Sequence, residues 1–246
     1  MLSEFLLQFK TQFSFFNLFE YLTFKTAISA ITALVISFII GPLIIKILKR
    51  YQIGEEIRHN GPKSHLTKRG TPTMGGVIII FATLLPTLLY SDLSNTMIII
   101  ILFSTLWMGI IGFIDDYLKI IVKAKEGMIA RYKMIGQIIL GIIISYVIII
   151  SSEFNGFNTK TTVPFFKNFE FDLGIFYPVM VILVITATSN AVNLTDGLDG
   201  LAIGLLAICF SVFTAISYIS GRIDFSDYLN ILYLPNASEL SIFASA

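Results

Sequence analysis

Three short polar segments, which interrupt long apolar runs, hold most of the residues that could do chemistry. They read HNGPKSHLTKRGTPTMGG over 59–76, GFIDDYLK over 112–119 and SNAVNLTDGLDGLA over 189–202. The first contains Lys68 and Thr73, whose ammonium and hydroxyl groups can bind phosphate oxygens near a helix N-terminus. An ordinary basic loop that leads into a helix is the alternative interpretation of this segment.

The second segment places two carboxylates side by side. Asp115 and Asp116 follow an apolar run, so we expect them at the C-terminal end of a helix, where the helix dipole disfavours anions. Adjacent carboxylates also repel each other unless a cation lies between them. Mg²⁺ bound together with phosphates could be that cation, as could Lys119 one turn later. Lys133 follows at the start of the next helix, and a solvated helix end with salt bridges is the competing interpretation.

The third segment is rich in carboxylates and amides and contains no basic residue. Asn190 and Asn193 are three residues apart and share a face if the segment is helical, and Asp196 and Asp199 have the same spacing. No Lys or Arg occurs anywhere from 173 to 221. We therefore expect a ligand to supply the missing cation or hydrogen-bond donor. The alternative is a turn built from turn-forming residues.

The composition shows what kind of scaffold must position these segments. The chain of 246 residues is 55% hydrophobic and 13% charged, and its mean hydropathy is +0.83. Soluble domains carry about 25% charged residues, and disordered chains are far less apolar. The glycines show no collagen period, and a single cysteine excludes a disulfide scaffold. The net charge of +1 gives no reason to expect a nucleic-acid partner, so we predict an integral membrane protein.

Six runs of 19–23 residues contain no Asp, Glu, Lys or Arg. A helix needs about 20 residues to cross the hydrocarbon core, whereas membrane strands are shorter and alternate in polarity. We therefore predict an all-α fold, a polytopic transmembrane helical bundle with six full spans and the start of a seventh. The expected bounds are 24–45, 74–91, 96–114, 134–151, 174–192, 200–220 and, for the partial seventh span, 237–246.

The distribution of basic residues predicts the orientation in the membrane. Of the 17 Lys and Arg, 12 lie in 46–69 and 115–133, the loops after the first and third spans. The positive-inside rule places this face, and with it all three polar segments, in the cytoplasm and the N-terminus outside. We expect the Phe-rich residues 1–22 to form an interfacial helix on the outer surface. Residues 151–172 are expected to form a small hairpin at the membrane surface.

The polar segments also resemble the motifs of a known family. In this order, GTPTMGG, DDYLK and NAVNLTDGLDGLA resemble polyprenyl-phosphate N-acetylhexosamine-1-phosphate transferases, and GTPTMGG favours the phospho-N-acetylmuramoyl-pentapeptide-transferase branch. The resemblance runs from about Gly41 to the end of the chain. It implies transfer of phospho-MurNAc-pentapeptide from UDP-MurNAc-pentapeptide to undecaprenyl phosphate, which gives lipid I and UMP. This step belongs to peptidoglycan synthesis at the cytoplasmic face of the bacterial inner membrane.

The same resemblance implies roles for individual residues. Asp115 and Asp116 match the acidic pair proposed to act on the lipid phosphate, as a base or as a covalent nucleophile. The implied cofactor is Mg²⁺, with Asn193 and Asp116 as its implied ligands in this chain. The implied substrate-binding residues are Lys68, Thr73, Lys119, Lys133, Asn190, Asn193, Asp196 and Asp199. A homodimer is a further expectation from the family.

Two other functions stay open at this point. One is a related enzyme that transfers GlcNAc-1-phosphate, and the other, from a different class, is a secondary transporter. Transporters usually place ionisable residues near the membrane midplane, whereas here they lie at one face. The family has further transmembrane helices, a late metal-binding Asp and a His-rich segment that do not occur in this sequence. We therefore expect the chain to be a fragment of a longer protein and to be inactive alone.

Overall fold

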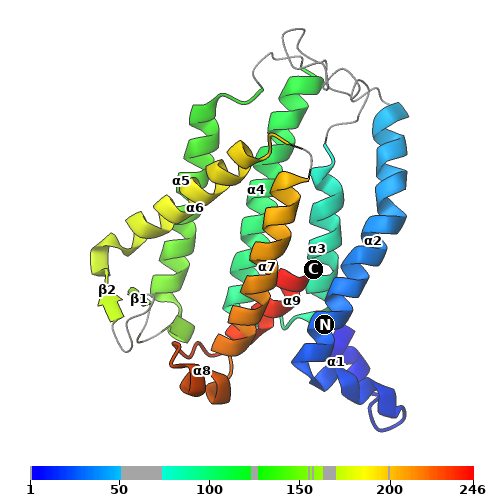
Figure 1. The fold of residues 1–246 in the computed structure, drawn as a ribbon, viewed down its shortest axis with the longest axis vertical. Helices are drawn as coiled ribbons and strands as arrows, with labels where there is room; N and C mark the ends of the chain where they lie inside the picture. Colours follow the sequence, from blue (N-terminus) through cyan, green and yellow to red (C-terminus); the bar gives the residue numbers. More distant parts are fainter. Residues whose placement is uncertain are drawn as a thin grey trace.

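The structure is a computed structural model that describes residues 2–50, 74–122, 127–154, 156, 158–162, 170–198 and 200–246. Helices make up most of it (Figure 1). In chain order the elements are α1 (Leu2–Leu7), η1 (Ser14–Glu20), α2 (Leu22–Arg50), α3 (Gly76–Tyr90), α4 (Thr96–Ile120), α5 (Ala130–Ile150), η3 (Ser152–Phe154), β1 (Lys160–Thr162), β2 (Glu170–Asp172), η4 (Gly174–Phe176), α6 (Tyr177–Thr195), α7 (Leu201–Ser220), α8 (Ile223–Leu229), η5 (Ala237–Glu239) and α9 (Leu240–Ser245).

The predicted class of multi-pass helical membrane protein is confirmed. Within the described residues, α2, α4, α5, α6 with η4, and α7 are long and apolar enough to cross a membrane. Helix α3 is equally apolar but has 15 residues, which corresponds to about 22 Å at 1.5 Å per residue. The expected total of six full spans and the orientation stay predictions. The expected partial seventh span contains η5 and the short helix α9.

The long helices alternate in direction, so the bundle has two distinct ends (Figure 1). The N-terminal elements α1 and η1, the strands β1 and β2, and helices α8 and α9 lie toward one end, at the bottom of the view. At the other end α3 begins, α4 ends, α5 begins and α6 ends. The described parts of all three polar segments therefore lie at the end of the bundle away from the N-terminus.

The N-terminal residues differ from the expected interfacial helix over 1–22. They form a short α-helix, α1, and a separate 3-10 helix, η1. Aromatic side chains lose rotamer freedom in a helix, so a Phe-rich run favours a helix only weakly. The two pieces bring Phe19 into contact with the membrane helices, with ring centroids 5.1 Å from Phe24 and 6.2 Å from Tyr90. The interfacial position of this segment stays a prediction.

The expected antiparallel strands within 151–172 are confirmed, while their position at the membrane surface stays a prediction. Strands β1 and β2 pair antiparallel, with Lys160 opposite Asp172, and add a small sheet to the otherwise helical fold. An ion pair of 2.8 Å joins Lys160 Nζ to Glu170 Oε2 across the pair of strands. The hairpin lies at the end of the bundle opposite the polar segments, so it takes no part in the site described below.

Polar contacts with α2 hold η5 and α9 in the bundle. Lys25 Nζ lies 3.0 Å from Glu239 Oε1, and both side chains are largely shielded. Ser29 Oγ donates to the carbonyl of Ile242 at 3.0 Å, and both residues are fully buried. Buried polar groups need such partners because water is excluded from them. The last helix of the chain is therefore docked against the first long one.

Two contacts fix how α4, α5 and α6 pack beside one another. Trp107 Nε1 donates to the carbonyl of Gly136 at 2.9 Å and joins α4 to α5. Trp107 and Asp115 lie eight residues apart on α4, so they share the face that meets α5. Between α5 and α6, a Cβ built on Gly141 would lie 2.7 Å from Ile182 Cγ1 and 3.0 Å from its Cα. Only glycine lets the two helix backbones approach this closely.

We predict that Gly141→Ala destabilises the protein. The added methyl would push against the backbone of α6 at Ile182, which cannot rotate away, and overpacking of this kind costs about 1–3 kcal/mol. Thermal unfolding in detergent measures the effect. The matched control is Gly204→Ala in α7, where the added Cβ meets no described atom within 4 Å. Equal unfolding temperatures for the two variants would contradict the close approach of α5 and α6.

Candidate active site

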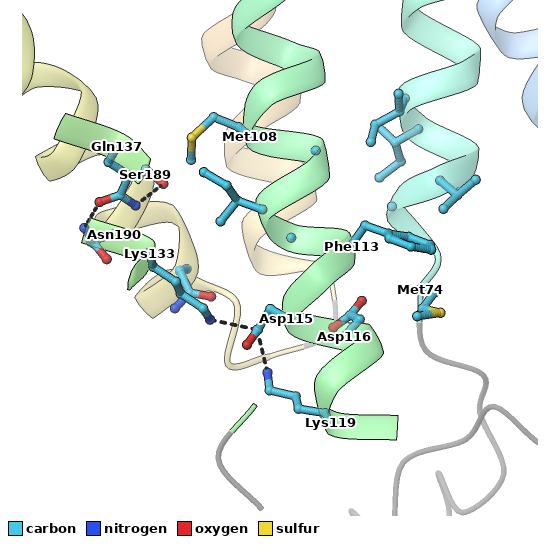
Figure 2. A pocket seen from close by; sticks show the side chains of 18 residues that line it. Met74, Met108, Phe113, Asp115, Asp116, Lys119, Lys133, Gln137, Ser189 and Asn190 are labelled. Carbon is cyan, nitrogen blue, oxygen red and sulfur yellow. Dashed lines mark hydrogen bonds and ion pairs between the residues drawn. The ribbon is translucent and has the colours of Figure 1, made fainter. Parts of the chain in front are cut away.

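A cavity of about 500 Å³ lies between α3, α4, α5 and α6 at the end of the bundle where the polar segments meet (Figure 2). Its α3 side is apolar, while α4, α5 and α6 supply charged and amide groups. The polar side chains that line it are Asp115, Asp116, Lys119, Lys133, Gln137, Ser189, Asn190 and Asn193. The cavity therefore joins the second and third polar segments, and Met74 and Gly76 from the first segment also line it.

Asp115 is the centre of an ion-pair network inside this cavity. Its Oδ2 accepts hydrogen bonds from Lys119 Nζ at 2.8 Å and from Lys133 Nζ at 2.7 Å. Its Oδ1 accepts one from the backbone N–H of Met128 at 2.8 Å. The residue is only 7% exposed, so these three donors replace the water that it has lost. Lys119, one of the two cations considered for the acidic pair, therefore pairs with Asp115.

The local sequence explains why these groups meet. Lys119 follows Asp115 by four residues on α4, so the two side chains are neighbours on one helix face. Lys133 lies in the first turn of α5, where the helix dipole disfavours a cation. The carboxylate of Asp115 compensates for that position. The Asp115–Lys133 pair thus joins the last turns of α4 to the first turn of α5.

Gly127 allows the backbone to close around Asp115. Its φ is +66°, and a Cβ at this position would lie 2.6 Å from Asp115 Oδ1 and 2.6 Å from Lys119 Cε. Glycine is the residue that adopts positive φ without steric cost. This turn directs the N–H of Met128 at the carboxylate. Sequence reasoning missed Gly127, although the pattern EGM just before a helix start was a usable signal.

Asp116 differs from its neighbour in both direction and partners. Figure 2 shows Asp115 directed at Lys119 and Lys133, whereas Asp116 points away from them, toward the side where Met74 lies. Among the described residues, no Lys or Arg side chain lies within ion-pair distance of Asp116. Helix α4 continues to Ile120, so both carboxylates lie within its last two turns and not beyond its end. One carboxylate is therefore neutralised, and the other presents its charge to the cavity.

The α5–α6 side of the cavity is held by a chain of amide hydrogen bonds. Gln137 Nε2 donates to Ser189 Oγ at 3.0 Å, and Asn190 Nδ2 donates to Gln137 Oε1 at 3.1 Å. Gln137 is 4% exposed. Asn193 lies one turn beyond Asn190 and lines the same cavity, as the shared-face expectation requires. Sequence reasoning missed Gln137 and Ser189; the signal was a lone amide in an apolar helix, one turn after Lys133.

The remaining predicted site residues have different outcomes. Asp196 lies in the exposed turn directly after α6 and does not line the cavity. Lys68, Thr73 and Asp199 lie outside the described residues, so their roles stay predictions. The structure thus brings polar side chains of the second and third segments together in one cavity. It also adds the backbone N–H of Met128 and the side chain of Gln137 to the site.

The cavity supplies some of the oxygen ligands that a magnesium ion needs. Within the described ranges, no group of three or more His, Cys, Asp and Glu side chains lies close enough to hold a metal. Asp116 and Asn193 supply a carboxylate and an amide oxygen at the cavity. Mg²⁺ keeps several waters and is commonly bound through one or two carboxylates plus substrate phosphates. These two residues therefore fit a site that a phosphorylated substrate would complete.

Among the described residues that line the cavity, the charges balance. Two carboxylates, Asp115 and Asp116, oppose two ammonium groups, Lys119 and Lys133. An incoming phosphate would compete with Asp115 for the lysines, while Asp116 would stay uncompensated. A phosphorylated ligand would therefore need positive charge beyond these two described lysines. The arrangement can bind phosphate oxygens at one wall and form neutral hydrogen bonds at the amide wall.

Comparison with known proteins identifies the family of the chain. Residues 98–238 match the family described as glycosyl transferase family 4, and residues 68–80 match phospho-N-acetylmuramoyl-pentapeptide-transferase signature 1. Proteins named phospho-N-acetylmuramoyl-pentapeptide-transferase from Desulforapulum autotrophicum and Desulfosudis oleivorans are 46% and 45% identical to the chain. Their alignments cover 98% and 100% of this chain but 67% and 68% of the relatives.

A third relative extends the same result. The protein of that name from Pelobacter propionicus is 47% identical over 94% of this chain and 64% of its own length. The chain thus spans about two thirds of the length of these relatives. It belongs to glycosyl transferase family 4 and, within it, to the phospho-N-acetylmuramoyl-pentapeptide-transferases, a family of enzymes.

We predict that Gly127→Ala destabilises the protein through its contact with Asp115. Alanine at positive φ costs about 1–2 kcal/mol, and here the added methyl would also displace the carboxylate from the Met128 N–H. Thermal unfolding should show a larger loss than for Gly156→Ala. Gly156 has φ +94° but no described atom within 4 Å of an added Cβ, so it isolates the backbone strain. An equal loss in both variants would show that the Asp115 contact contributes nothing.

Proposed function

We propose that the complete protein containing this chain transfers phospho-MurNAc-pentapeptide from UDP-MurNAc-pentapeptide to undecaprenyl phosphate. The observation that supports this proposal most directly is the charged cavity around Asp115, in a chain that is 45–47% identical to transferases of that name. The products are lipid I and UMP. The reaction would be the first membrane step of peptidoglycan synthesis.

The chemistry explains why a cavity of this composition suits the reaction. An oxygen of the lipid phosphate attacks the phosphorus that carries the sugar, and the bond from that phosphorus to the UMP oxygen breaks. Both reactants are anions, and the transition state spreads negative charge over the phosphoryl oxygens. Catalysis of phosphoryl transfer is therefore mostly positioning and charge stabilisation. Lys119 and Lys133 supply positive charge at one wall of the cavity.

The two carboxylates would act differently. Both oxygens of Asp115 already accept hydrogen bonds, so its role is to hold Lys119 and Lys133 in place. Asp116 has no such lysine partner among the described residues and faces the cavity, so it is the better candidate to touch the reacting groups. Asp116 can accept the proton of the lipid phosphate for direct attack or act as a covalent nucleophile.

We infer that Mg²⁺ is the cofactor. The charges of the described residues that line the cavity cancel, so two phosphorylated substrates would add negative charge that these side chains alone do not balance. Asp116 and Asn193 are the residues present that would hold the ion together with substrate phosphates. When bound, Mg²⁺ would polarise the phosphoryl oxygens and neutralise charge that develops there.

The orientation and the remaining site residues belong to the same proposal. With 12 of 17 basic residues in 46–69 and 115–133, the cavity end, where α4 ends and α5 begins, would face the cytoplasm of the bacterial inner membrane. UDP-MurNAc-pentapeptide would then reach the cavity from the aqueous side, and undecaprenyl phosphate from the bilayer. Lys68, Thr73, Asp196 and Asp199 are proposed on the nucleotide side. A homodimer remains an expectation from the family resemblance.

The alternatives are weaker on specific grounds. A GlcNAc-1-phosphate transferase is disfavoured because residues 68–80 match the signature of the muramoyl-pentapeptide branch. A secondary transporter is disfavoured because the charged residues of the cavity gather at one end of the bundle. Transporters place their binding sites near the midplane of the bilayer.

We predict that Asp116→Asn in the complete protein lowers turnover by about 10²–10⁴-fold, the usual contribution of a positioned acid or base. The substitution keeps the size of the side chain but removes its charge and basicity. The assay is exchange of labelled UMP into UDP-MurNAc-pentapeptide with undecaprenyl phosphate and Mg²⁺. An unchanged exchange rate would remove Asp116 from the mechanism.

The matched control is Asp224→Asn, which breaks an exposed ion pair with Arg222 beyond the far end of α7. We expect its exchange rate to equal that of the unsubstituted protein. No exchange by the unsubstituted protein, together with turnover of UDP-GlcNAc, would instead overturn the proposed substrate.

A further inference from the structure

The amide chain at the α5–α6 wall has a polarity that the structure determines. Asn190 Nδ2 donates to the backbone carbonyl of Thr186 at 2.7 Å, one helical turn earlier. A carbonyl oxygen can only accept, so the Asn190 atom facing it must be the nitrogen. The same nitrogen lies 3.1 Å from Gln137, whose facing atom must then be its oxygen. Gln137 consequently turns its nitrogen to Ser189 Oγ.

This polarity leaves one atom of Asn190 without a protein partner among the described residues, namely its amide oxygen. Both N–H groups of the amide are used, one by Thr186 and one by Gln137. Figure 2 shows the oxygen of Asn190 directed away from Gln137, and Asn190 lines the cavity. The group offered to a ligand is therefore a hydrogen-bond acceptor.

We propose that Gln137 is a positioning residue that locks the Asn190 amide with its oxygen toward the ligand. This corner of the cavity then accepts a hydrogen bond from a neutral donor on the substrate, a hydroxyl or an N–H group, and does not bind phosphate. The inference rests on the proposed function, because the donor is assigned to the nucleotide-linked sugar substrate. Phosphate oxygens would instead be bound at the neighbouring wall, by Lys119 and Lys133.

The burial of Gln137 shows that this polar side chain does not serve to contact solvent. It is a neutral polar residue, 4% exposed, in a membrane helix whose neighbours are mostly apolar. A buried amide is unfavourable unless both ends are hydrogen-bonded, and here both ends meet α6. Gln137 also follows Lys133 by one turn, so a single helix face links the phosphate wall to the amide wall.

The test measures binding as well as turnover in the complete protein. We expect Gln137→Leu to raise the KM for UDP-MurNAc-pentapeptide about tenfold, the effect of one lost hydrogen bond, with little change in kcat. Inhibition by inorganic pyrophosphate, which carries no neutral donor, should stay unchanged. Gln137→Glu keeps an oxygen facing Asn190 in either protonation state and should restore the KM. The control Ser145→Ala, at a buried hydroxyl that bonds to its own helix, should change neither value.

A double-mutant cycle separates positioning from packing. If Gln137 acts through Asn190, then adding Gln137→Leu to Asn190→Leu should raise the KM no further. Additive effects, or equal weakening of pyrophosphate and nucleotide-sugar binding, would overturn the proposal. Should Gln137→Leu not fold, Asn190→Leu alone must still weaken the nucleotide sugar and spare pyrophosphate.

A further comparison identifies the source of the donor. UMP binding measured by calorimetry weakens in Gln137→Leu if the donor lies on the uridine and is unaffected if it lies on the sugar-peptide; either result supports the acceptor role. The proposed transferase activity and the proposed role of Gln137 would be refuted by different results. An unsubstituted protein that binds these ligands but shows no UMP exchange refutes the transferase, whereas normal exchange with no effect of Gln137→Leu refutes the role of Gln137.

Discussion

The site depends first on the burial of one carboxylate, Asp115, between two lysines. A buried charge is tolerated only when it is paired and fully hydrogen-bonded, and this requirement ties three parts of the chain together. Lys119 comes from the same helix, Lys133 from the next one, and the N–H of Met128 from the turn between them. The Asp115 carboxylate, which organises the cavity, therefore also holds the cavity ends of α4 and α5 together.

In a membrane, helix packing depends strongly on polar contacts such as the Asp115 ion pairs and the amide chain beside them. Apolar side chains provide no preference for one helix neighbour over another where the solvent is itself apolar, so close backbone approach and polar contacts decide the packing. Gly141 allows α6 to approach α5, and Gln137 then bonds to Ser189 and Asn190. The two walls of the cavity are thus built on successive turns of α5. One wall suits phosphate, and the other suits neutral donors.

Much of this could be predicted from residue order alone. Charge-free runs of membrane length predict a helical bundle, and the i,i+4 spacing predicts that Lys119 reaches Asp115. The shared face of Asn190 and Asn193 follows from their spacing in the same way. The less successful expectation concerned the N-terminus. Residues 2–20 form two short helices instead of one, because local propensity is too weak to define where a helix ends.

What the sequence by itself determined was the class of protein, the identity of the reactive groups and the family, since these depend on composition and local spacing. The unequal partners of Asp115 and Asp116 were decided only by the tertiary structure. The two residues are adjacent and chemically identical, yet helix geometry turns one toward α5 and the other away from it. The same holds for Gln137, whose partners lie more than 50 residues away in the chain. Spacing along one helix cannot reveal which side chain of another helix will lie opposite, because that depends on how the helices pack.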